Sequence, residues 1–357
     1  MASRQEQFSG TRPVREAHRF DESGLADYLA AHIEGFEGPL AVSQFRGGQS
    51  NPTYRLDTPS GRYVLRRKPP GKLLKSAHAV DREYRVIAAL HGAGFPVPRP
   101  WLLCEDDDVV GTTFFVMDFV EGRIFWELDL PGMDATERGA LYDDVNRTIA
   151  ALHNLDYEAL GLGDFGKPGN YFERQISRWS KQYRASETTT IEAMDFLIDW
   201  LPKHIPEDDA SSIVHGDFRL DNLVIHPHEP RVVAVLDWEL STIGHPLGDF
   251  MYHLMGWQMP EVGFGSAGLA GKDLAALGIP GEDEYVRRYC ERTGRPEGIA
   301  NREFYAAYNL FRLAAILQGI AGRVRDGTAS SDHAEQAARA VGPLADLGRD
   351  YARRTGR

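Results

Sequence analysis

The amino-acid sequence predicts an α+β protein of two lobes, in which a five-stranded antiparallel sheet with one helix precedes a mainly helical lobe. Short runs rich in β-branched and aromatic residues, separated by turn residues, occupy about the first 120 residues. After Gly122 the apolar residues recur at helical spacing instead. A chain of 357 residues also exceeds a typical single-core domain, so two lobes are the expected arrangement.

The strands expected in the first lobe follow one another with turns between them. They are Ala41 to Arg46, Thr53 to Asp57, Arg62 to Arg66, Pro100 to Cys104 and Thr112 to Phe119. Thr58-Pro59-Ser60-Gly61 and Glu105-Asp106-Asp107-Asp108 are two of the turns. Between the third and fourth strands, apolar residues spaced three and four apart predict a helix from Val80 to His91.

The second lobe is expected to be helical except for one hairpin. Leu141, Val145, Ile149 and Leu152 form an amphipathic stripe, and Phe304 to Ile320 has the composition of a buried helix. The hairpin consists of two apolar runs between Leu223 and Leu236, on either side of a Pro-containing turn. The polar stretch from residue 1 to 20 is interpreted as a mobile N-terminal arm, which leaves 21–120 and 121–357 as the two lobes.

Charge and cysteine content restrict the partners and the compartment. The 40 basic and 52 acidic side chains give a net charge of −12, which disfavours nucleic acid or an anionic membrane as a partner, although local basic patches could still bind phosphates. The two cysteines are too few for a disulfide framework and suit a reducing compartment. No apolar run approaches the ~20 residues of a membrane span, and the N-terminus does not read as a secretory signal. We therefore expect a soluble cytoplasmic protein.

The most specific chemical signal is His-Gly-Asp-Phe-Arg-Leu-Asp-Asn, residues 215–222, followed fifteen residues later by Asp237. The hairpin between them would place Asn222 and Asp237 side by side. An amide oxygen and a carboxylate can share Mg²⁺, which takes oxygen ligands and keeps substrate phosphates in its shell. Asp217 would then be the base that accepts or orients a hydroxyl. The pattern predicts phosphoryl transfer.

This spacing, H-x-D-x-x-x-x-N and then D, resembles the catalytic loop and metal-binding Asp of kinases. Gly216 replaces the Arg usual in protein kinases, and Asp-Trp-Glu from Asp237 replaces D-F-G. Both departures indicate the aminoglycoside phosphotransferase and choline kinase-like branch. Residues 45–51, 63–74 and 76–78 resemble most the phosphotransferase-like domain fused to some acyl-CoA dehydrogenases. The resemblance implies a protein kinase-like fold that uses ATP and Mg²⁺.

The resemblance also implies a set of nucleotide-binding residues in the first lobe. Arg66 aligns with the Lys of V-A-I-K that holds the α- and β-phosphates, and Glu83 on the next helix would be its partner. Lys68, on the same face of the strand, is a rival cation, and a solvated basic strand end is the alternative interpretation. Backbone groups of Asp118 and Val120 are the candidates for the adenine edge. The phosphate-covering loop would consist of Gly47, Gly48, Gln49, Ser50 and Asn51, although a glycine pair between strands is also an ordinary turn.

Around Asp217, three further residues have expected roles. Arg219 is placed like a Lys that many protein kinases carry two residues after the catalytic Asp, and it could stabilise the transferring phosphoryl group. His215 is expected to hold the loop by hydrogen bonds. Asp249 resembles the buried Asp at a helix start that braces this loop, and a helix N-cap is the alternative.

The leading hypothesis is an ATP- and Mg²⁺-dependent O-phosphotransferase that acts on a hydroxyl of a small molecule. The resemblance suggests a hydroxyacyl-CoA-type acceptor, whereas the negative net charge would favour an aminoglycoside or amino alcohol. A nucleotide-binding regulator without catalysis is the alternative of another class, because Arg66 replaces Lys and D-F-G is missing. The sequence predicts no oligomeric state.

Overall fold

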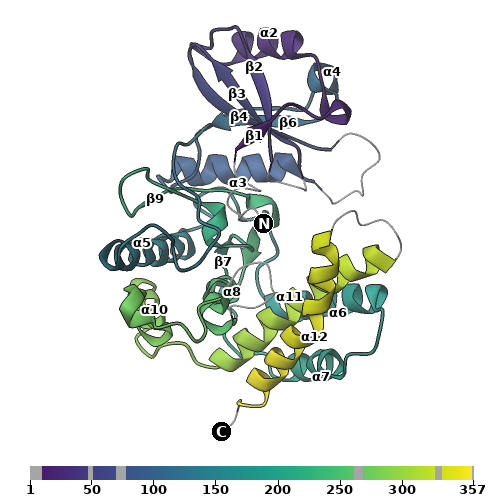
Figure 1. Cartoon of the computed structure of the whole chain (residues 1–357), viewed down its shortest axis with the longest axis vertical. Helices are drawn as coiled ribbons and strands as arrows, with labels where there is room; N and C mark the ends of the chain where they lie inside the picture. Colours follow the sequence, from purple (N-terminus) through teal and green to yellow (C-terminus); the bar gives the residue numbers. More distant parts are fainter. Residues whose placement is uncertain (1–9, 47–50, 70–77, 261–267, 326–331, 356–357) are drawn as a thin grey trace. The chain divides into compact units, whose positions relative to one another are not determined.

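The computed structural model describes residues 10–46, 51–69, 78–260, 268–325 and 332–355 (Figure 1). The chain divides into two compact units. The first comprises Met1–Trp126, Glu158–Leu162 and Asp221–Ser241, and the second comprises Glu127–Tyr157, Gly163–Leu220 and Thr242–Arg357. The segment 221–241, with Asn222 and Asp237, thus belongs to the first unit, although a simple boundary at residue 120 would assign it to the second.

The first unit is built on a six-stranded antiparallel sheet in the order β1-β2-β3-β4-β6-β5. The strands are β1 Thr11–Arg12, β2 Ala41–Phe45, β3 Thr53–Thr58, β4 Gly61–Arg67, β5 Pro100–Cys104 and β6 Phe114–Asp118. The sequence predicts all but β1. The segment predicted as a turn at 105–108 instead leads into the short helix α4, Asp107–Val110, which begins after the N-cap Asp106.

The N-terminal stretch, for which the sequence predicts a mobile arm, is ordered against the sheet over its described residues 10–20. Strand β1 pairs with the end of β2. After it, the 3₁₀ helix η1, Glu16–His18, presents the carbonyl oxygen of His18 to the Tyr54 hydroxyl at 3.0 Å and to the Arg67 guanidinium at 2.9 Å. The mobile-arm prediction is therefore wrong for these residues. A two-residue strand is too short to show the alternation that reveals strands in sequence.

The central strand β4 sends successive side chains to opposite faces of the sheet. Helix α2, Glu22–His32, buries Leu25 and Leu29 against one face, and this face also receives Arg67. Helix α3, Val80–Gly92, lies on the other face (Figure 1). On this face Arg66 contacts Glu83 of the helix. The alternation of β4 therefore gives the two adjacent arginines different environments.

The predicted hairpin is present in the first unit as β8, Leu223–Ile225, and β9, Val232–Val235. The Leu236 N–H donates to the Asn222 carbonyl at 2.8 Å, so the pairing continues to the point where Asp237 follows. Gly122 lies against this hairpin, and a Cβ at this position would be 2.4 Å from the Ile225 oxygen. The backbone therefore brings Asn222 and Asp237 to the same end of the hairpin, as the sequence predicts.

The second unit is mainly helical. Helix α11 packs against α12, α6 and α8, and α5 packs against α10 and β7. The helices are α5 Ala135–His153, α6 Tyr171–Ser186, α7 Glu192–Trp200, α8 Pro246–Gln258, α9 Leu274–Leu277, α10 Glu282–Arg292, α11 Arg302–Arg325 and α12 Asp332–Ala352. The predicted stripe of α5 is fully buried. An antiparallel pair of three-residue strands, β7 Ser212–Val214 and β10 Thr242–Gly244, is not predicted by the sequence.

Neither buried cysteine forms a disulfide. Among the described residues, no helix combines the length and the hydropathy needed to cross a membrane.

Candidate active site

In the second unit, the loop after β7 carries Asp217 and is braced by Asp249 of α8. The carboxylate of Asp249, a residue that is 3% exposed, accepts the backbone N–H of His215 at 2.7 Å and of Gly216 at 2.9 Å. Burial alone would raise the pKa of Asp249, but hydrogen bonding and electrostatic interaction with His153 and His215 hold it below its usual value. The bracing role predicted for Asp249 is confirmed, and the N-cap of α8 is His245 instead.

His153, at the end of α5, supports the same brace. Its Nε2 lies 3.4 Å from an Asp249 carboxylate oxygen, and its Nδ1 lies 2.7 Å from the Tyr289 hydroxyl. The His153 and Asp249 side chains are almost fully buried. The position of Asp249, and with it the start of the loop that carries Asp217, therefore depends on α5 and α10 as well as on α8.

Three side chains fix Asp217 within the loop. The Tyr252 hydroxyl donates to Oδ1 of Asp217 at 2.6 Å, and Nε of Arg219 lies 3.3 Å from the same oxygen. The Asp217 N–H donates to Nδ1 of His215 at 3.1 Å, as expected of a loop-holding histidine. Burial, reinforced by the Asp217 charge, raises the pKa of Tyr252 well above its usual value, so this hydroxyl stays protonated and remains a donor.

Arg312 of α11 holds the loop from another side. Its NH2 group donates to the Gly216 carbonyl at 2.6 Å, and only 6% of the residue is exposed. Its guanidinium carbon lies 4.9 Å from the Tyr252 ring centre and 5.8 Å from that of Trp179. Arg312 therefore positions both the loop backbone and the tyrosine that contacts Asp217.

In the first unit, Arg66 lies at the centre of a cluster of three carboxylates. Its Nε is 2.8 Å from Oε2 of Glu83, an ion-pair contact whose angle is poor for a hydrogen bond. Its NH2 group donates to Oδ1 of Asp237 at 2.7 Å and to Oε2 of Glu239 at 3.1 Å. The Arg66–Glu83 pair is thus present, and the same guanidinium also reaches the proposed metal carboxylate. One cation faces three anions here, which favours the approach of a further cation.

The electrostatics of this cluster affect Glu83 most. Burial, together with the charges of Asp237 and Glu239, outweighs the attraction of Arg66 and raises the pKa of Glu83 to about 7. Because this value lies above the usual 4.5, the folded state binds the Glu83 proton more tightly than the unfolded state does.

We therefore expect a pH-dependent contribution of Glu83 to stability. The contribution is greatest at low pH and is lost as the pH rises from 4.5 to about 7. The loss should amount to about 3 kcal/mol. Urea denaturation in EDTA, from pH 4.5 to 8, should show the free energy of unfolding of the wild type falling relative to that of Glu83→Gln. If the free energies of unfolding of the wild type and Glu83→Gln differed by the same amount at every pH in this range, the raised pKa of Glu83 would be contradicted.

Glu239 was not predicted as a site residue, but it joins Arg66 to a second group of polar side chains. Its Oε2 accepts from Nδ2 of Asn51 at 3.3 Å, and Oδ1 of Asn51 lies 2.9 Å from Nδ1 of His78. Asn51 is 1% exposed. Asn51 therefore orients Glu239, and its side chain is occupied by protein contacts.

Asn222 and Asp237 supply the oxygen ligands that Mg²⁺ prefers. Asp237 has φ +66° and ψ 61°, a left-handed conformation that is uncommon for a residue other than glycine and recurs at functional sites. Among the described residues, no group of three or more His, Cys, Asp or Glu side chains is arranged to hold a metal. A pair of oxygen ligands fits Mg²⁺ nevertheless, because phosphate and water oxygens normally complete its shell.

The remaining predicted residues have less direct support. Nζ of Lys68 lies 3.5 Å from Asp81 and is not part of the Arg66 cluster, so the geometry favours Arg66 as the phosphate-binding cation. The Asp118 N–H donates to the Arg99 carbonyl at 2.9 Å. The backbone carbonyl of Asp118 is therefore the group of this residue that we propose to accept a hydrogen bond from the edge of the adenine ring. For the Val120 N–H, no partner occurs among the described residues. Gly47, Gly48, Gln49 and Ser50 lie outside the described residues.

Removing the Tyr252 hydroxyl tests the arrangement around Asp217. We expect Tyr252→Phe to lower kcat about tenfold, because loss of one charge-assisted hydrogen bond costs roughly 1.5 kcal/mol. The KM for the phosphoryl donor should change little, since the proposed nucleotide residues belong to the other unit. Steady-state kinetics on the wild type and the variant measure both constants. An unchanged kcat would show that Arg219 and the loop backbone hold Asp217 without the tyrosine.

Comparison with known proteins identifies the family of the chain. Residues 41–308 match the phosphotransferase enzyme family. Acyl-CoA dehydrogenase family member 10 of Mus musculus is 44% identical over 347 residues, which cover 97% of this chain and 32% of the relative. Member 11 of Rattus norvegicus is 44% identical over 354 residues, 97% of this chain and 45% of the relative. The chain thus spans less than half the length of these relatives.

Solved structures show the same fold. A protein from Ralstonia eutropha, provisionally assigned as an aminoglycoside phosphotransferase, is 55% identical, with a TM-score of 0.87 over 94% of this chain and 99% of that one. A thermostable mutant of aminoglycoside phosphotransferase APH(4)-Ia, in complex with AMP-PNP and hygromycin B, is 17% identical, with a TM-score of 0.59 over 94% of this chain and all of that one. At that identity it shows the fold alone. The extent of the family match establishes that the chain belongs to the phosphotransferase enzyme family.

Proposed function

We propose that the protein is a small-molecule kinase that transfers the γ-phosphoryl group of ATP to a hydroxyl, with Mg²⁺ as cofactor. The observation that carries the proposal is the Arg66 cluster, in which one guanidinium faces Glu83, Asp237 and Glu239. Such a cluster combines a phosphate-binding cation with an unbalanced negative charge suited to a divalent cation. Asn222 and Asp237 would hold Mg²⁺, which would neutralise charge on the phosphate oxygens.

In the proposed reaction, each of these residues would have a separate role. Arg66 would bind the α- and β-phosphates as a planar fork, positioned by Glu83. Asp217, oriented by Tyr252, would accept the proton of the acceptor hydroxyl as the new P–O bond forms and the bond from the γ-phosphorus to ADP breaks, with ADP as the leaving group. Arg219 would stabilise the transferring phosphoryl group from its place beside Asp217. The carbonyl of Asp118 and the N–H of Val120 would bind the adenine edge, and Gly47 to Ser50 would cover the phosphates.

A hydroxyacyl-CoA-type metabolite is the acceptor that the relatives favour. The two mammalian relatives are named acyl-CoA dehydrogenase family members 10 and 11, and this chain matches less than half of the length of each. A phosphotransferase that occurs beside an acyl-CoA enzyme would share its class of substrate. An aminoglycoside is the competing acceptor, because the Ralstonia eutropha protein is provisionally assigned to that activity.

The experiment that tests the proposal is incubation with Mg²⁺-ATP and a panel of hydroxyacyl-CoAs, aminoglycosides and amino alcohols. Mass spectrometry would detect any phosphorylated product. A product that forms with the wild type and is absent with Asp217→Asn would establish the kinase and its class of acceptor. Binding of Mg²⁺-ATP without phosphorylation of any member of the panel would favour the alternative of a nucleotide-binding regulator.

A further inference from the structure

Helix α6 of the second unit carries a basic groove. The groove has a volume of about 720 Å³, within the range of roughly 300–1,000 Å³ that small-molecule sites occupy. Its charged lining consists of Lys167, Arg174, Arg178, Lys181 and Glu173. Four cations against one carboxylate give a local charge of +3 in a chain whose net charge is −12. A concentration of positive charge of this kind calls for an anionic ligand.

The charge of the groove is not balanced by carboxylates within the described part of the chain. No ion pair joins Lys167, Arg174, Arg178 or Lys181 to any Asp or Glu that the structure describes. By contrast, other arginines of the unit, such as Arg288 and Arg292, are paired with Asp143. Repulsion among neighbouring cations in one groove is unfavourable, so a bound anion would stabilise it.

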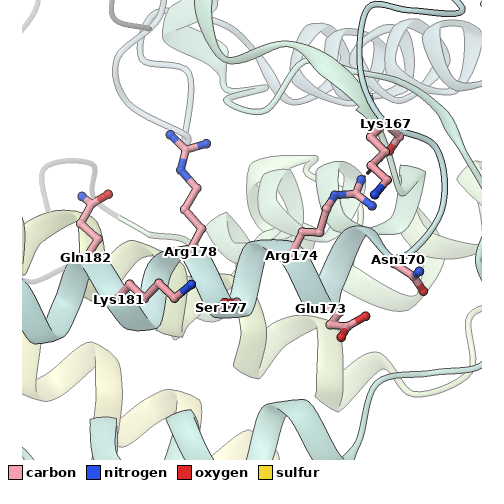
Figure 2. Close-up of a pocket in the computed structure, with 8 residues that line it drawn as sticks. All are labelled: Lys167, Asn170, Glu173, Arg174, Ser177, Arg178, Lys181 and Gln182. Atoms are coloured by element: carbon pink, nitrogen blue, oxygen red, sulfur yellow. Dashed lines mark hydrogen bonds between the residues drawn. The ribbon is translucent and has the colours of Figure 1, made fainter. Parts of the chain in front are cut away.

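Part of the groove is pre-organised. Arg174 donates to the carbonyls of Lys167 and Gly169, which fixes its guanidinium against the loop before α6. Figure 2 shows Arg174 beside Lys167, with Arg178 extending from the helix one turn further along. A fixed arginine with neighbouring cations can receive phosphate oxygens at several points.

A chain of contacts connects the groove to the catalytic loop within the same unit. The Arg178 guanidinium lies 5.3 Å from the Trp179 ring centre, and the Arg312 guanidinium lies 5.8 Å from it. Arg312 in turn donates to the carbonyl of Gly216, the residue before Asp217. The helix that carries the groove is thus also the helix against which Arg312 packs, so a ligand in the groove would contact a structural support of the catalytic loop.

We propose that the α6 groove binds the phosphate groups of the acceptor, and that the acceptor is a nucleotide-bearing thiol ester of the coenzyme A type rather than a cationic amino sugar. The inference rests on the proposed function, and it deepens that function by assigning the acceptor's anionic part to Lys167, Arg174, Arg178 and Lys181. A pyrophosphate and a phosphomonoester, both present in coenzyme A, match a groove with four cations. An aminoglycoside, being cationic, would be repelled by it.

Titration calorimetry with free coenzyme A, without ATP, tests the assignment independently of turnover. The test variant is Arg178→Gln/Lys181→Gln. The matched control, Lys203→Gln/Arg287→Gln, removes two exposed cations of the same unit that are paired with Asp199 and Glu291. We expect the test variant to bind coenzyme A about tenfold or more weakly, and the control to bind like the wild type. Equal affinities in all three proteins, or no binding to the wild type, would overturn the assignment.

Two further arms identify the source of the phosphate and the place of binding. The affinity for coenzyme A should be unchanged in the presence of a saturating concentration of Mg²⁺-AMP-PNP. Displacement of coenzyme A by Mg²⁺-AMP-PNP would place coenzyme A in the nucleotide site and would contradict its assignment to the α6 groove. Sodium tripolyphosphate should bind more weakly than coenzyme A, and equal affinity would assign the groove to free polyphosphate instead. Failure of the kinase proposal can be distinguished from failure of the groove assignment. If only the kinase proposal fails, the protein binds ATP without transferring a phosphoryl group, and the calorimetric titration with coenzyme A still gives the expected result.

Discussion

Replacing Asp217 with Asn is expected to lower kcat by about 10²- to 10⁴-fold, the usual contribution of a positioned acid or base. An amide has nearly the same shape as a carboxylate, so the loop should remain folded around its braces to Asp249 and Arg312. It cannot accept the proton of the acceptor hydroxyl. The KM for ATP should stay near the wild-type value, since the proposed nucleotide residues lie in the other unit.

The measurement is steady-state kinetics with the acceptor found in the panel, together with the affinity for Mg²⁺-AMP-PNP. Asn222→Ala is the informative comparison, because loss of a proposed Mg²⁺ ligand should weaken nucleotide binding as well as turnover. A wild-type rate in Asp217→Asn would exclude Asp217 as the base. Stabilisation of the transferring phosphoryl group by Arg219 would then be the main proposed contribution of this loop.

The sequence predicts those parts of the site that are close together along the chain. The contact of Arg66 with Glu83 is implied by the resemblance to kinases, whereas the hairpin from 222 to 237 follows from two apolar runs and a turn. Such patterns predict contacts because the spacing along one hairpin or between consecutive elements limits the possible geometries.

The parts that sequence reasoning missed come from distant segments of the chain. Tyr252 lies 35 residues from Asp217, and Arg312 lies 96 residues from Gly216. Tyr252 belongs to a helix in which every residue from Pro246 to Trp257 is buried, so no amphipathic pattern shows which side chain faces the loop. Arg312 could have been noticed as the one charged side chain in the sequence from Phe304 to Ile320, since a buried charge requires a partner.

Glu239 was missed for a different reason. It stands in the Asp-Trp-Glu motif itself, but the kinase pattern assigns a metal role only to Asp237. The 3₁₀ helix η4, Trp238–Leu240, turns tightly enough that Asp237 and Glu239 both reach the NH2 group of Arg66. A residue pattern does not specify this local turn, and only the structure shows that Arg66 serves three carboxylates.

Replacing Arg66 with Met should destabilise the first unit by about 3–5 kcal/mol, the usual cost of removing one partner from a buried ion pair. Arg66 is 8% exposed and Glu83 is 2% exposed, so water cannot readily replace the lost guanidinium. The effect should be greater at pH 8.5 than at pH 6. Without Arg66, the pKa of Glu83 rises further above 7, and at low pH the carboxyl avoids an unpaired charge by taking up a proton.

The double variant Arg66→Met/Glu83→Gln separates charge from packing. Because the amide introduced by Glu83→Gln carries no charge to leave unpaired, the double variant should regain much of the stability lost in Arg66→Met and should lose the pH dependence. Urea denaturation at both pH values, in EDTA and without nucleotide, measures the coupling between the two sites. Equal destabilisation of the single and double variants would mean that the stem of Arg66 contributes through packing alone. In that case the cluster would have no net electrostatic role in stability, and the proposed binding of Mg²⁺ would be the remaining explanation for its excess of carboxylates.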